Sequence, residues 1–143
     1  MNHRSFIRLA AAFVLCLGCA GAFAQVAVVV NTKSPLASMT ADQVSAIFLG
    51  KSATLPSGGT ALPTDLPDSA GTRELFYTKV TAKSTAQVKA AWSRLVFSGK
   101  ATPPKELASS ADVKKFVAAN PDAIGYIEKS AVDSSVKVIF TAD

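Results

Sequence analysis

The stretch that decides the fold is Val26-Ala27-Val28-Val29-Val30, an uninterrupted apolar run that ends at Asn31. β-Branched side chains fit strands well, and an apolar run without polar alternation predicts a strand that is buried on both faces. Strands of this kind occupy the middle of α/β sheets. We therefore expect residues 26–30 to form the centre of the sheet.

Two capping boxes predict two helices further along the chain. The first is Thr40-Ala41-Asp42-Gln43 and the second is Ser84-Thr85-Ala86-Gln87; in each, the first and last side chains satisfy backbone N–H groups of one another. A glycine just past each predicted helix would end it. Trp92 lies on the apolar stripe of the second helix, which favours a place in the core over stacking on a ligand.

The remaining pattern completes an α/β order. A helix is predicted from about residue 70 to 81, a shorter one after Ser109 or Ser110, and strands at 123–127 and 136–140. Ala61-Leu62 is interpreted as a short strand that Pro63 confines to an edge or an end of the sheet. Residues 101–107 are predicted to be a connection. Together these elements predict a small mixed sheet with helices on both sides.

The first 24 residues have the pattern of a secretory signal. Basic residues at positions 3, 4 and 8 precede an apolar segment, and Ala22-Phe23-Ala24 is a cleavage site before Gln25. The apolar segment is shorter than the ~20 residues that a membrane-spanning helix needs. We therefore predict a signal peptide at 1–24, one domain at 25–143, export to the periplasm, and no stable membrane insertion after cleavage.

Cleavage would also remove every cysteine and histidine. Cys16, Cys19 and His3 all precede residue 25, so the mature chain would hold no metal site and no catalytic centre built on these residue types. Lipidation at Cys19 is disfavoured, because Cys16 stands where a lipid-attachment signal usually has Leu. No nucleophile–base spacing stands out among the other residues, so we predict a non-enzyme without a cofactor.

Charge gives a weaker indication. Removal of two arginines with the signal leaves 13 basic and 10 acidic residues, a formal charge of +3. This balance suits a small anionic ligand without requiring one. The Lys and Arg residues are scattered and do not cluster with aromatic residues, which predicts no nucleic-acid partner.

A candidate anion site lies where a turn of small residues enters the helix predicted at 70–81. The first turn of a helix has unpaired backbone N–H groups that attract anions. Gly71 would let a ligand approach the backbone, Ser69 and Thr72 offer hydroxyls, and Arg73 could form a bidentate pair with an oxyanion. The alternative is an ordinary helix start, with Asp68 or Ser69 as N-cap and Arg73 in solvent.

Residues 40–51, 71–76 and 121–127 follow one another in the same order as three motifs that they resemble, those of the periplasmic phosphate-binding protein family of ABC transporters. Residues 40–51 are similar to its L-s-x-x-q-l-x-x-I-F-x-G-k helix, Gly71-Thr72-x-x-x-Phe76 to its S-G-T-x-x-x-F helix start, and residues 121–127 to its P-G-A-I-G-Y-v strand. Residues 92–100 and Pro103-Pro104 look more like short, single-lobe members. The resemblance implies an α/β fold, a single lobe of a type II periplasmic-binding-protein-like fold, because 119 residues suffice for one lobe only.

The family's phosphate motif, Arg-x-Asp-x-Ser-Gly-Thr, is only partly kept. Asp68, Gly71 and Thr72 match it, whereas Leu66 and Ala70 stand at its Arg and Ser positions. Ser69 and Arg73 lie one place away as substitutes. The ligand-binding residues that we expect for phosphate or another small anion are Asp68, Ser69, Ala70, Gly71, Thr72 and Arg73, with Ser38 and Thr40 from the first helix start.

Two functions follow from the resemblance. The first is phosphate or oxyanion binding linked to ABC-type phosphate uptake, with an ABC permease or another periplasmic protein as partner. The second is an accessory interaction protein that keeps the fold and has lost the ligand. An exposed apolar patch around residues 57–59 or Trp92 would favour the second function.

Overall fold

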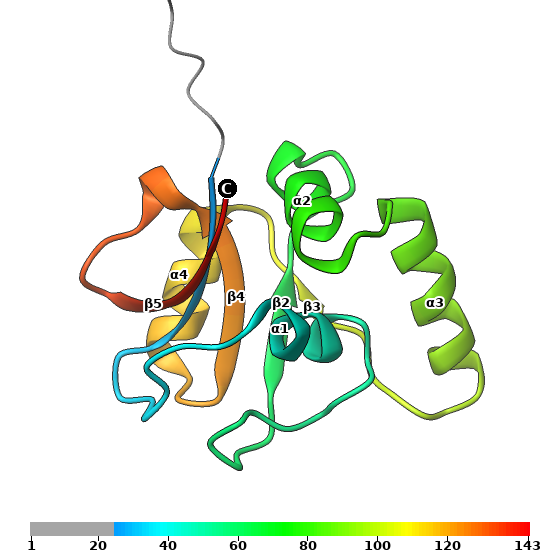
Figure 1. Cartoon of the computed structure of the whole chain (residues 1–143), viewed down its shortest axis with the longest axis horizontal. Coiled ribbons are helices and arrows are strands. Elements are labelled where there is room, and N and C mark those ends of the chain that lie inside the picture. Colours follow the sequence, from blue (N-terminus) through cyan, green and yellow to red (C-terminus); the bar gives the residue numbers. More distant parts are fainter. Residues whose placement is uncertain (1–24) are drawn as a thin grey trace, which may run out of the picture.

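The structure, a computed structural model, describes residues 25–143 (Figure 1). The signal peptide and the question of lipidation at Cys19 concern residues outside this range. Within it, one five-stranded sheet has the strand order β3-β2-β4-β1-β5, with helices on both faces. No helix between residues 25 and 143 is long and apolar enough to cross a membrane.

The elements follow one another in the order predicted, with one additional strand. The strands are β1 (Val26–Asn31), β2 (Leu62–Asp65), β3 (Lys105–Glu106), β4 (Ala123–Glu128) and β5 (Val136–Ala142). The helices are α1 (Ala41–Phe48), α2 (Gly71–Phe76), which continues as a π-helical turn (Tyr77–Thr81), α3 (Thr85–Phe97) and α4 (Ser110–Ala119), and a 3₁₀ turn (Lys129–Ala131) precedes β5.

Strand β1 is buried throughout, as its apolar run predicts. It pairs antiparallel with β4 on one side and with β5 on the other, and Val26 lies opposite Ala142, so the two ends of the folded chain are neighbours. The prediction that residues 26–30 form the centre of the sheet is wrong: β4 is the central strand. Burial on both faces identifies a covered strand, but it does not distinguish the central strand from the one beside it.

Strand β2 also lies inside the sheet, between β3 and β4, and not at its edge. Its pairing explains how Pro63 is accommodated. The Leu62 N–H donates to the carbonyl of Asp122 beside β4. The backbone nitrogens of consecutive strand residues point alternately toward the two neighbouring strands, so the nitrogen of Pro63 points toward β3. Pairing with β3 begins only at Thr64. The missing N–H therefore costs no sheet hydrogen bond, and β3 itself lies in the stretch predicted to be a connection.

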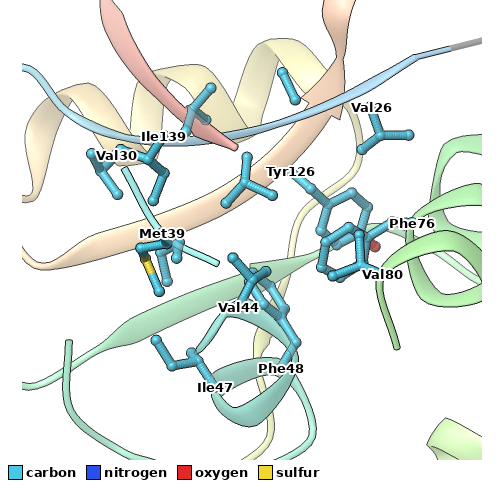
Figure 2. Packing of buried hydrophobic residues seen from close by; sticks show 14 of the residues in the cluster. Val26, Val30, Met39, Val44, Ile47, Phe48, Phe76, Val80, Tyr126 and Ile139 are labelled. Carbon is cyan, nitrogen blue, oxygen red and sulfur yellow. The ribbon is translucent and has the colours of Figure 1, made fainter. Parts of the chain in front are cut away.

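The two faces of β4 carry different layers. A Cβ atom at Gly125 would come within 2.6 Å of both the Thr64 hydroxyl and a Val113 methyl of α4, so only glycine lets α4 pack this closely. Tyr126, the next residue, faces the opposite layer, where it stacks on Phe76 at 4.1 Å between ring centroids and meets the edge of Phe48. Figure 2 shows this aromatic cluster between α1, α2 and the sheet.

Both predicted capping boxes are present, at the starts of α1 and α3. Helix α3 packs on the π-helical turn and on the end of α1, and lies at the periphery of the molecule (Figure 1). The indole N–H of Trp92 donates to the carbonyl of Phe48 at 2.8 Å, and the residue is only 9% exposed, which confirms its role in the core. The same helix leaves Val96 49% and Phe97 96% exposed.

Candidate functional site

The helix predicted at residues 70–81 is formed by α2 and the π-helical turn. The predicted N-cap is wrong, because Ala70 occupies that position and no side chain caps the helix. Asp68 instead turns toward the helix and pairs with Arg73 at 2.7 Å. An ion pair therefore joins the loop before the helix to the first turn of the helix.

Arg73 does not extend into solvent. Its side chain is buried, and its Nε lies 3.2 Å from Oδ1 of Asp65, while its Nη1 contacts Asp68. Its guanidinium also lies over the ring of Tyr77, 5.2 Å from the centroid. Burial lowers the pKa of Arg73, but the attraction and hydrogen bond of Asp65, together with the interactions of Tyr77 and Tyr126, outweigh it and the pKa is raised. The charge that could have held an external oxyanion is thus neutralised within the chain.

Asp65 is the centre of this buried network. It accepts hydrogen bonds from the Tyr77 hydroxyl at 2.9 Å, from the Tyr126 hydroxyl and from the backbone N–H of Leu66. Burial, followed by the charge of Asp65, raises the pKa of both tyrosines above their ordinary value. Asp65, at the end of β2, therefore links α2, the π-helical turn and β4.

A pocket of about 380 Å³ lies on the other side of the α2 start, where it faces the start of α4. Gly71 opens onto free space, since a Cβ there would meet no atom within 4 Å. The Thr72 hydroxyl donates to Oε1 of Glu128 at 2.9 Å. The residues lining this pocket, called here the α2–α4 pocket, are Leu66, Ala70, Gly71, Thr72, Ala108, Ser109, Ser110, Ala111 and Glu128.

The structure divides the predicted site residues into three groups. Residues 70–72 line the α2–α4 pocket, whereas Asp68 and Arg73 line a different cavity. Ser69 is exposed and lines neither. Thr40 is occupied as the N-cap of α1, and Ser38 is exposed away from both cavities. Of the Ser and Thr hydroxyls that line the α2–α4 pocket, that of Thr72 donates to Glu128 and that of Ser109 to Asp112, which leaves the proton of the Ser110 hydroxyl for a ligand.

Sequence reasoning missed the part played by Ser109, Ser110 and Glu128. The sequence predicts only a helix cap at Ser109 or Ser110, a role that Ser109 does fill by accepting from the Asp112 N–H. Glu128 ends β4, and its position beside α2 depends on the parallel pairing of β2 with β4. That pairing joins residues 61 positions apart and has no local sequence signal.

The second cavity is a groove of about 670 Å³ between α3 and the β2–β3 side of the sheet. One wall is α3, and the other is formed by the ends of β2 and β3 with the two prolines before β3. Its lining, called here the α3 groove, is Asp65, Leu66, Asp68, Arg73, Lys89, Trp92, Ser93, Val96, Phe97, Pro103, Pro104 and Glu106. Among residues 25–143, no cluster of three His, Cys, Asp or Glu side chains is arranged to hold a metal ion.

Comparison with solved structures gives similar chains from phosphate transport. A substrate-binding protein assigned to phosphate ABC transport from Clostridium perfringens, solved with bound phosphate, matches with a TM-score of 0.65 and 24% identity, over 81% of this chain and 45% of its own. An ABC-type phosphate transport receptor from Vibrio cholerae matches with a TM-score of 0.64 and 24% identity, over 81% of this chain and 46% of its own. PstS from Borrelia burgdorferi matches with a TM-score of 0.60 and 12% identity, over 81% of this chain and 47% of its own. No family model and no curated protein matches the sequence.

These matches concern the fold. The chain spans less than half the length of each matched protein, and the sequence identities are low. Its single sheet with flanking helices is the fold of one lobe of these proteins, which confirms the fold class and the structural resemblance inferred from the sequence.

Proposed function

We propose that this chain is an exported, non-enzymatic protein that binds phosphate or a similar oxyanion in the α2–α4 pocket, in support of ABC-type phosphate uptake. The observation that carries the proposal is an open pocket at Gly71 and Thr72 in a fold shared with phosphate-transport binding proteins. The proposal includes removal of residues 1–24 as a signal peptide, a periplasmic location and an ABC permease as partner.

The residues of the pocket suit a protonated oxyanion. The Ser110 hydroxyl can donate to an anion oxygen, those of Thr72 and Ser109 can do so on leaving their present acceptors, Glu128 and Asp112, and Gly71 leaves room for close approach. Glu128 is a carboxylate and can only accept when ionised, so it would favour an anion that still carries a proton, as phosphate does and sulfate does not. Because Arg73 is paired inside the chain and one lobe covers one side of the ligand, the affinity should be modest.

Calorimetric titration tests the proposal. Phosphate should release heat with a Kd in the micromolar to millimolar range, and sulfate should bind at least about tenfold more weakly. A Cβ at Gly71 meets no atom within 4 Å, so Gly71→Leu places its side chain in the pocket and should abolish phosphate binding, whereas Ser38→Ala, which lies outside the pocket, should leave the Kd unchanged. No heat and no thermal shift at millimolar phosphate would end the proposal.

A specific observation also favours the second function, an accessory interaction protein without a ligand. Arg73 is neutralised by two carboxylates, Glu128 adds a negative charge to the pocket, and α3 carries the exposed apolar side chains Val96 and Phe97 beside Trp92. This function predicts that a stable protein partner is recovered from a periplasmic extract and that neither anion shifts the melting temperature. Recovery of no partner would count against it.

A further inference from the structure

The α3 groove combines a cavity with a largely apolar lining and a projecting aromatic side chain. Leu66, Trp92, Pro103 and Pro104 contribute apolar lining, and the volume of about 670 Å³ is in the range of ligand-sized pockets. Phe97 stands at the mouth of the groove, and 96% of it is exposed. A phenylalanine so fully in water gives up the stabilisation that burial would provide, so a partner that covers it gains that contribution.

The charges around the groove are divided between its two walls. Arg94 precedes Phe97 by three residues on the exposed side of α3, so the two side chains are neighbours on the helix surface. Asp68 and Glu106 lie on the opposite wall and are exposed. Within residues 25–143, Arg94 and Glu106 form no ion pair. One wall therefore offers an aromatic ring beside a free cation, and the other offers an apolar hollow beside a free carboxylate.

A surface that holds both a projection and its matching hollow is complementary to itself. Two-fold dimers require this property, because each copy presents the same patch to the other. We propose that the α3 groove is a self-association site in which Phe97 of each copy enters the groove of the second copy, with Arg94 facing Glu106 across the interface. This inference goes beyond the proposed oxyanion function and does not depend on it.

The location of the groove keeps the two functions separate. Helix α3 rests on α1 through Trp92, so its outer side is free to pair without disturbing the core. Gly71 and Thr72 line the α2–α4 pocket and not the α3 groove. A dimer formed through α3 would therefore leave the α2–α4 pocket accessible to an anion.

Sedimentation equilibrium of the purified protein, in buffer without phosphate, tests self-association. We expect a monomer–dimer equilibrium with a Kd of roughly micromolar order. Phe97→Ala removes a contact of the kind that dominates interfaces and should raise this Kd at least about 30-fold. Leu62→Ala is the matched control, because Leu62 is 42% exposed at the far end of β2 and should leave the Kd unchanged. Phe97 is so exposed that its removal should not lower the melting temperature.

A charge exchange tests the orientation of the two copies. Arg94→Glu and Glu106→Lys should each weaken the dimer about tenfold, since two symmetric pairs change from attraction to repulsion. The double variant should restore the wild-type Kd. Concentration-dependent amide shifts in NMR should be confined to α3 and residues 103–106. A protein that stays monomeric at millimolar concentration, a dimer insensitive to Phe97→Ala, or a double variant as weak as the single ones would overturn the proposal.

Discussion

Replacement of Asp65 by asparagine is the most informative single change in this protein. The substitution keeps the shape of the side chain and removes its charge. It takes the buried ion-pair partner from Arg73, and because an amide has one acceptor oxygen where the carboxylate has two, Tyr77 and Tyr126 can no longer donate to separate oxygens. Asp65 is 9% exposed, so water cannot replace the lost interactions.

The expected cost follows from these contacts. Removing one partner of a buried ion pair costs about 3–5 kcal/mol. Arg73 keeps its contact with Asp68, which is exposed, so we expect a value near the lower limit, about 3 kcal/mol. For a domain of this size, that corresponds to a decrease of roughly 10 °C in melting temperature.

Urea denaturation followed by circular dichroism measures this effect. The midpoint should fall while the slope of the transition stays the same, because the surface exposed on unfolding does not change. Asp122→Asn is the control, since Asp122 is an exposed carboxylate outside the network, and it should change the free energy of unfolding by less than about 0.5 kcal/mol. If Asp65→Asn is as stable as the control, the buried network does not hold α2 to the sheet.

Three further predictions concern other parts of the structure. Both tyrosines of the chain have a raised pKa, so their contribution to stability is present below pH 10 and is lost as the pH rises above 10. Ultraviolet titration should therefore show phenolate only at a pH where circular dichroism shows unfolding. Hydrogen bonds from the Ser135 hydroxyl and backbone and from Lys114 lower the pKa of Asp133 to about 2, so its contribution is complete above pH 4 and is lost as the pH falls to about 2; acid denaturation of Asp133→Asn should lack this component. Gly125→Ala should destabilise by about 2 kcal/mol, measured by urea denaturation, because its Cβ has no room beside α4; a neutral effect would mean that α4 can move away from β4.

The sequence predicted the elements whose signals are local. The capping boxes at Thr40 and Ser84 set the starts of α1 and α3, because the hydrogen bonds that they form lie within four residues. The apolar run of β1 predicted its burial. The resemblance to phosphate-binding proteins added the fold of a single lobe, which the matched structures confirm.

Features that depend on pairing between distant residues could not be predicted in the same way. β3 is two residues long and exists only because it lies beside β2. Pro63 is tolerated inside the sheet because the pairing of β2 with β3 begins at Thr64, one residue after the proline. At the candidate site, residue types suggested that Arg73 would bind an anion. In the structure Arg73 pairs with Asp65, eight residues earlier in the chain, because both side chains are buried against the same aromatic cluster. Which carboxylate meets a buried arginine is decided by packing.

The pairing of Val26 with Ala142 has a consequence for how this fold can be used. Because entry and exit of the folded unit lie side by side on β1 and β5, a host polypeptide could leave a surface loop, run through residues 26–142 and return to the same loop with little distortion. A carrier protein with residues 26–142 inserted into an exposed loop should keep both parts folded. An insertion of the same fold through new ends made within β4 should not, because it would interrupt the central strand.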